Sequence, residues 1–229
     1  MIDPGMTSLF ITISVLVKPQ VLWDVGANIG YYSWLMLSRD PNMRVVLLEP
    51  DPENARLIRE TIRRASLQFA ELHEVAISDQ DGEAAFLLDN VSSATGSLET
   101  IRHSFIKTHY GIENQKINVK TITLDTLCCQ RAPNLVKIDT EGSEERVLKG
   151  AQKTITTHQP ILVIECCGDA RNRILPWLND MGYTFFDADR IIDASENTSN
   201  FLCLPFRLRS VTSELLETWK REFDHLKST

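Results

Sequence analysis

A strand that runs into a glycine-spaced turn, at residues 21–32 (VLWDVGANIGYY), constrains the fold of this chain more than any other stretch. The apolar residues 21–23 predict a buried β-strand, Gly26 and Gly30 frame the turn, and a helix is expected from Tyr31. Glycine has no Cβ and tolerates positive φ, so such a turn brings bare backbone and a helix N-terminus close to a ligand. The segment therefore predicts an α/β fold with a binding crevice at this turn.

Two acids accompany the turn. Asp24, at the end of the first strand, is expected to face the same crevice. A second strand over residues 44–48 ends in Glu49, which follows Gly26 by 23 residues. A doubly wound fold places a carboxylate at about this distance to accept hydrogen bonds from a ribose. The combination favours a turn that binds a nucleoside ligand over a tight strand-to-helix turn that binds none.

The same turn argues against a ligand that is held by its phosphates. The dinucleotide pattern G-x-G-x-x-G is absent, because Asn28 stands where its second glycine would let backbone approach a pyrophosphate. No Walker lysine follows Gly30. S-adenosylmethionine carries a ribose and an adenine but no phosphate, so we expect it as the cofactor. Gly26, Asn28 and Gly30 are its predicted contacts in the turn, with Asp24 and Glu49 beside them.

The third strand is expected over residues 70–78, and residues 83–88 are expected to add an edge strand. Asp79 follows the third strand beside the ribose position, where it would bond the adenine amino group; an ordinary turn aspartate is an equal alternative. The irregular residues 89–115 are a candidate substrate lid, because long loops in compact domains are often functional; an ordinary charged surface segment is an equal alternative. His103 and His109 lie in this segment.

Further acids follow two later strands. The predicted strand at 134–138 runs into Asp139, with Glu141 two residues beyond, and the strand at 161–164 ends in Glu165. In an open parallel sheet the carboxyl ends of the strands form the ligand crevice, so these acids should gather there. Asp139, Glu141 and Glu165 are also suited to a hard cation. No residue spacing demands one, and no metal is predicted.

Composition narrows the class of protein. A chain of 229 residues most simply forms one domain, over residues 1–229. The net charge of −7 argues against a nucleic-acid partner. The apolar run at 9–17 is too short to span a bilayer and lacks the basic flank of a signal peptide. Five cysteines without zinc spacing indicate reduced thiols and a cytoplasmic location. A helix over about 212–227 carries an apolar stripe that predicts core packing.

Taken together, the motifs resemble those of the FkbM family of S-adenosylmethionine-dependent methyltransferases over about residues 20–205. The segments that carry the resemblance are VLWDVGANIGYYS, LLEPDPEN, EVAISDQDG, TITLD and VKIDTEGSEERVLKGA. The resemblance implies a class I methyltransferase (Rossmann-like) fold: a doubly wound, seven-stranded sheet, mostly parallel, with one antiparallel strand near the edge. It also implies O-methyl transfer to a hydroxyl of a sugar, a glycan or a secondary metabolite.

Methyl transfer from a sulfonium to a neutral hydroxyl requires alignment and removal of a proton. A general base within hydrogen-bond reach contributes roughly 10²–10⁴-fold. Asp139 and Glu141 are the predicted catalytic residues, and His103 and His109 are alternative bases. Two other functions remain open: a non-catalytic nucleotide-binding module on the same fold, and, with weaker support, an NAD-dependent dehydrogenase.

Overall fold

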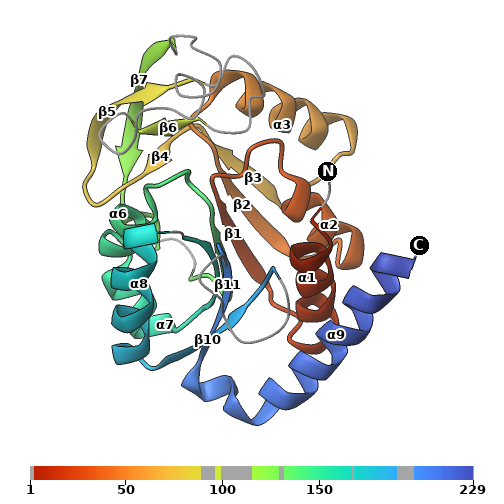
Figure 1. Cartoon of the computed structure of the whole chain (residues 1–229). Coiled ribbons are helices and arrows are strands. Elements are labelled where there is room, and N and C mark those ends of the chain that lie inside the picture. Colours follow the sequence, from red (N-terminus) through yellow and green to blue (C-terminus); the bar gives the residue numbers. More distant parts are fainter. Residues whose placement is uncertain are drawn as a thin grey trace.

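A seven-stranded sheet forms the centre of the protein, in a computed structural model that describes residues 3–88, 96–98, 115–128, 132–166, 168–189 and 199–228 (Figure 1). The strand order is β10-β11-β9-β8-β1-β2-β3. Within this sheet β11 runs antiparallel to both of its neighbours, and the pairings among β9, β8, β1, β2 and β3 are parallel. The bounds are β1 Val21–Val25, β2 Arg44–Leu48, β3 Ala70–His73, β8 Leu135–Ile138, β9 Ile161–Glu165, β10 Tyr183–Asp187 and β11 Asn200–Pro205. The predicted fold class is confirmed.

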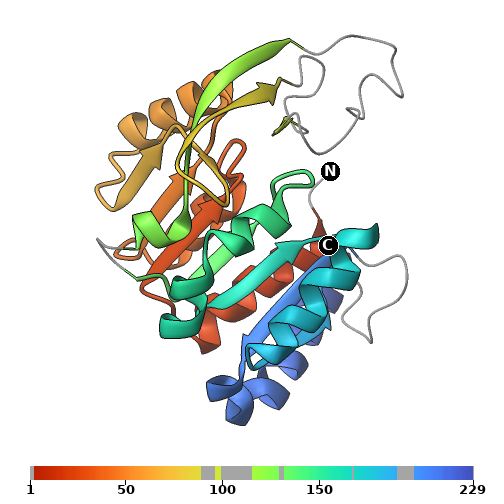
Figure 2. The same cartoon turned by 90° about the vertical axis from the view of Figure 1, so that its left-hand side faces the viewer.

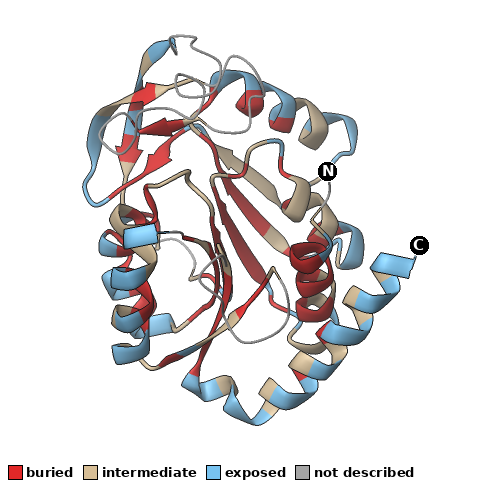
Figure 3. Ribbon diagram, in the orientation of Figure 1, coloured by how far each residue is buried: buried red, intermediate tan, exposed pale blue. Residues whose placement is uncertain are grey.

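Helices cover both faces of this sheet (Figures 1 and 3). One face carries α1 Pro4–Leu16, α2 Tyr31–Arg39, α3 Pro52–Arg64 and α9 Thr212–Ser228; the other carries α5 Leu124–Leu127, α6 Glu144–Lys149, α7 Gln152–His158 and α8 Gly168–Asp180. Successive side chains of β1 point to opposite faces of the sheet and so divide the core. Leu22 packs on the face covered by α1, α2, α3 and α9, and Trp23 packs on the face covered by α5 to α8. In the described part of the chain, no helix combines the length and apolar character that a bilayer crossing requires.

The two ends of the chain are packed together. Asp3 caps α1 by accepting hydrogen bonds from the N–H groups of Gly5 and Met6, at 2.7 and 3.1 Å. α9 lies along α1 (Figure 1), and its Trp219 is fully buried. The Trp219 indole N–H lies 3.1 Å from the carbonyl oxygen of Gly5 and 3.0 Å from the hydroxyl of Ser8. The first part of the apolar stripe of the C-terminal helix, at Leu215, Leu216 and Trp219, therefore packs in the core, as its spacing predicts.

A second, four-stranded sheet, at the top of Figure 2, was not predicted. Its order is β4-β7-β5-β6, with β4 Ala76–Ile77, β5 Gly82–Leu87, β6 Ser97–Leu98 and β7 Lys116–Ile122. The prediction of one strand over 70–78 is wrong, because β3 ends at His73 and β4 pairs with β7 in this small sheet. Likewise β5 joins β7 and β6 and does not extend the main sheet. Alternation along one segment shows that a strand forms but leaves its partner undetermined.

Candidate active site

A pocket opens where the carboxyl ends of β1, β2 and β8 meet the small sheet. Its empty space, including the open mouth, is about 610 Å³. The polar part of the wall includes Gly26, Asn28, Glu49, Asp139 and Glu141, and the apolar part includes Val75, Ile77, Phe86 and Leu98. This division suits a ligand with both a polar chain and an aromatic base.

The two glycines of the first turn are required by their contacts within the protein. Gly26 has φ +70°, and a Cβ there would lie 1.8 Å from the backbone oxygen of Asp139. Gly30 has φ +83°, and its Cβ would meet the indole of Trp34 at 2.6 Å. Gly26 lines the pocket, whereas Gly30 is not among the lining residues. The structure therefore gives Gly30 a role in closing the turn, and its ligand contact stays a prediction.

Replacing Gly26 with Ala is expected to destabilise the fold itself. The change combines a left-handed backbone, which costs about 1–2 kcal/mol for other residues, with a steric clash worth about 1–3 kcal/mol. Gly182→Ala is the matched control, because Gly182 has φ +83° and no atom within 4 Å of the added Cβ. Urea denaturation should show a clearly larger loss of unfolding free energy for Gly26→Ala. Equal losses would contradict the role of the Asp139 contact.

Glu49 is held ready to accept hydrogen bonds at the end of β2. Its Oε2 accepts from the N–H of Asn28 at 2.7 Å, and its Oε1 accepts from the N–H of Asp51 at 2.9 Å. Asn28 adopts a left-handed backbone (φ +53°), which asparagine tolerates better than most residues. Glu49 is only 5% exposed, and burial raises its pKa to about 7. Its place on the pocket wall agrees with the predicted ribose contact.

Asp24 lies beneath the pocket and is not among its lining residues. The carboxylate is fully buried, and burial raises its pKa. Its Oδ2 accepts a hydrogen bond from the Ser33 hydroxyl at 2.6 Å, and its Oδ1 lies 3.5 Å from Nζ of Lys137. The sequence predicted that Asp24 faces the ligand; in the structure its carboxylate contacts Ser33 and Lys137, and its ligand contact stays a prediction. Lys137 itself was missed, although a lysine inside an apolar strand is unusual unless an acid pairs with it.

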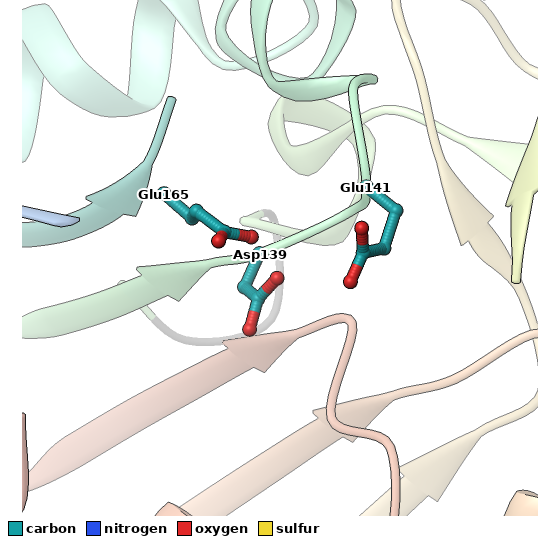
Figure 4. Close-up of side chains that lie close together, drawn as sticks. All are labelled: Asp139, Glu141 and Glu165. Atoms are coloured by element: carbon teal, nitrogen blue, oxygen red, sulfur yellow. The ribbon is translucent and has the colours of Figure 1, made fainter. Parts of the chain in front are cut away.

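Three acids converge beside the pocket (Figure 4). One carboxylate oxygen from each of Asp139, Glu141 and Glu165 lies within 4.8 Å of the others, so the predicted pair is brought together and Glu165 joins it. Asp139 and Glu165 share a hydrogen bond. We assign no metal ligand to this cluster, because acidic side chains also gather without an ion. The arrangement is suited to taking up a proton.

The two hydrogen-bonded acids differ in charge. Burial raises the pKa of Asp139, but the Lys137 ammonium, 3.1 Å from its Oδ2, and the hydrogen bond with Glu165 together outweigh burial, so the pKa lies below its usual range. Burial and the neighbouring Asp139 carboxylate raise the pKa of Glu165 to about 9. At neutral pH Asp139 is therefore ionised, whereas Glu165 carries the proton.

The loop after β8 presents Glu141 in a left-handed conformation, with φ +54°. A non-glycine residue there costs of order 1–3 kcal/mol, so the surrounding structure must hold it. Glu144 supplies this support, because its Oε1 accepts from the N–H and the hydroxyl of Thr140 and from the N–H of Gly142, at 2.9–3.0 Å. The sequence reading overlooked Glu144, although an acid in the first turn of a helix often contacts the preceding loop.

The remaining predicted residues have other surroundings or were not described. Asp79 is not among the residues that line the pocket, and its Oδ1 lies 2.8 Å from Nη2 of Arg146 on α6. This ion pair joins α6 to the segment after β4, and the adenine contact of Asp79 stays a prediction. His103 and His109 lie outside the described residues, as does most of the predicted lid at 89–115.

Solved structures of the same fold define the class of protein. The fold resembles the crystal structure of Methyltransferase FkbM from Methylobacillus flagellatus KT, with a TM-score of 0.54 and 18% identity, over 80% of this chain and 43% of that chain. It also resembles cofactor-bound Rv0187 from MTB, with a TM-score of 0.53 and 15% identity, over 90% and 82% of the two chains. The chain therefore has the class I methyltransferase fold.

Sequence relatives define the family more closely. The Methyltransferase FkbM domain matches residues 24–185, so the chain belongs to the FkbM methyltransferase family, and S-adenosylmethionine is its cofactor. Similar curated proteins include the 2-O-methyltransferase NoeI of Sinorhizobium fredii, 29% identical over 154 residues, and the hexuronic acid methyltransferase AglP of Haloferax volcanii, 29% identical over 149 residues. The matches cover 63% and 64% of this chain but only 63% and 56% of those relatives.

Proposed function

We propose that this protein transfers the methyl group of S-adenosylmethionine to a hydroxyl of a sugar or glycan, with Asp139 as the general base. The ionised Asp139 on the pocket wall carries this proposal. In the proposed arrangement Glu49 binds the ribose, the first turn holds the methionine portion, and Glu141 hydrogen-bonds the acceptor. A base is needed because a neutral hydroxyl must lose its proton as it attacks the methyl group.

The acceptor class follows from the names of the relatives and from the charges of the site. NoeI is named for 2-O-methyl transfer, and AglP for transfer to a hexuronic acid, which offers both hydroxyls and a carboxylate. A carboxylate acceptor needs no general base, and the ionised Asp139 beside Glu141 would repel it. The acidic wall therefore favours a hydroxyl acceptor and an ether product.

Transfer of labelled methyl from S-adenosylmethionine into a panel of acceptors tests the proposal. The panel should contain neutral oligosaccharides, their uronic-acid counterparts and hydroxylated secondary metabolites, each with and without EDTA. A methyl ether survives mild alkali, whereas a methyl ester does not, so alkali treatment separates attack by a hydroxyl from attack by a carboxylate. Label confined to alkali-labile product would overturn the proposed chemistry. Loss of transfer with EDTA would show that the acidic cluster works through a cation.

The two other functions have less support. A nucleotide-binding module without activity would need no ionised carboxylate beside the cofactor pocket. A dehydrogenase would bind a dinucleotide, and the first turn lacks the second glycine that brings backbone to a pyrophosphate. Calorimetry with S-adenosylhomocysteine and with NAD separates these ligands directly, and we expect heat of binding only from the first.

A further inference from the structure

We propose that Lys137 is a positioning residue that makes Asp139, rather than Glu165, the proton acceptor of the site. The inference rests on the proposed role of Asp139 as the base. Lys137 lies within β8, two residues before Asp139, and its side chain is only 4% exposed. It reaches the reaction through Asp139 and is not itself among the residues that line the pocket.

Three oxygen atoms hold the ammonium group of Lys137 in place. Nζ lies 3.1 Å from Oδ2 of Asp139 and 3.5 Å from Oδ1 of Asp24, and it donates a hydrogen bond to the carbonyl oxygen of Gly26 at 3.1 Å. Nζ also lies 5.8 Å from the ring centre of Tyr32. A buried charge with one weak partner would be costly, whereas these contacts compensate it from several sides. The Lys137 side chain therefore links the turn at Gly26 to Asp139, the proposed base.

The contacts of Lys137 decide which of two acids is ionised. Asp139 and Glu165 share a hydrogen bond, and two half-buried carboxyls so close together cannot both ionise readily. The ammonium contacts Asp139, so the negative charge settles there and the proton stays on Glu165. Five other titratable groups of the described chain interact with this pair: Asp24 on β1, Tyr32 on α2, Lys137 on β8, Glu141 on the loop after β8 and Glu144 on α6. Among these groups the positive charge belongs to Lys137.

A purely structural lysine would behave differently. Its task would be to neutralise Asp24, and removing both charges together would then leave the acids beside the pocket unchanged. If Lys137 sets the charge of Asp139, the same double replacement changes the titration of the pair. The two roles are therefore separated by a pH titration but not by a stability measurement alone.

The experiment compares Asp24→Asn with the double variant Asp24→Asn/Lys137→Met, using carboxyl ¹³C NMR titration of the whole chain. The double variant leaves no buried charge unpaired at position 24, which favours folding, and a thermal melt checks this. Asp139→Asn and Glu165→Gln assign the two resonances. In Asp24→Asn we expect Asp139 to be ionised and Glu165 protonated at pH 7. In the double variant the first ionisation of the pair should move upward by more than one pH unit.

The double variant and the parent chain can each overturn the inference. An unchanged first ionisation in a folded double variant would leave Lys137 a structural role only. If the double variant does not fold, the parent chain still decides, because a parent in which Glu165 is ionised and Asp139 protonated at pH 7 contradicts the proposal. The titration needs no methyl acceptor, so its outcome is independent of the proposed function. Should Asp139→Asn keep full methyl transfer, the function of Asp139 as base fails while the charge assignment stands.

Discussion

Replacing Asp139 with Asn is expected to slow methyl transfer by about 10²–10⁴-fold, the usual contribution of a general base. The amide cannot take the acceptor's proton, although its size and its place on the pocket wall are preserved. The affinity for S-adenosylhomocysteine should change little, because Glu49 and the first turn are unaltered. Single-turnover transfer to an acceptor found in the labelled screen, together with calorimetry, separates the two quantities.

Glu165→Gln is the matched control for that experiment. Glu165 is already protonated at neutral pH, since its pKa is raised to about 9, and glutamine resembles the protonated acid. We therefore expect the rate to fall by less than about tenfold, far less than for Asp139→Asn. Equal losses in the two variants would mean that both acids act as one unit. Parent rates in both would remove Asp139 as the base and leave His103 and His109 as candidates.

Removal of the Glu49 carboxylate is expected to weaken cofactor binding by at least about 100-fold. Hydrogen bonds to a charged group are worth about 1.5–3 kcal/mol each, and the two ribose hydroxyls would lose the same acceptor. Glu49→Ala should show this loss in calorimetry with S-adenosylhomocysteine while the protein stays folded. Affinity within twofold of the parent would place the ribose elsewhere.

The pH dependence of cofactor binding provides a second test of the role of Glu49. Its pKa of about 7 in the free protein means that the ionised acceptor must form before the ribose binds. The dissociation constant should rise by up to about tenfold for each pH unit below 7. Glu49→Gln should bind weakly with little pH dependence from pH 5 to 8. A parent affinity that is equally flat would show that the carboxyl group does not titrate in this range.

The raised pKa of Glu49 also predicts that stability falls as pH rises, whereas cofactor affinity increases. The folded-state pKa of about 7 lies above the ordinary value of 4.5, so the folded chain binds more protons than the unfolded chain between these values. Unfolding free energy should therefore fall as pH rises from about 4.5 to 7, by at most about 3 kcal/mol from this group. Without cofactor, Glu49→Gln should melt at a higher temperature than the parent at pH 8. An equal or lower melting temperature would contradict the prediction that the ionised, buried Glu49 destabilises the fold.

The local features of the site were available from the sequence. A strand, two glycines and a following helix are consecutive, so the turn at Gly26 could be predicted from neighbouring residues alone. Glu49 and Asp139 were found because strand ends in a parallel sheet meet at one edge. For these residues, position along the chain and the rules of the fold class together fix where the side chain lies.

Contacts between distant segments were decided only by the tertiary structure. β8 pairs with β1 on one side and with β9 on the other, and this order brings Lys137 to Asp24 and Glu165 to Asp139. For Asp79 the sequence leaves an adenine contact and an ordinary turn as equal alternatives, because it does not show that Arg146 reaches this carboxylate from α6. Which acid is ionised depends on burial and on charges a few ångströms away, and both depend on the packed fold. The sequence thus determined which groups gather at the sheet edge, and the tertiary structure determined how they share charge.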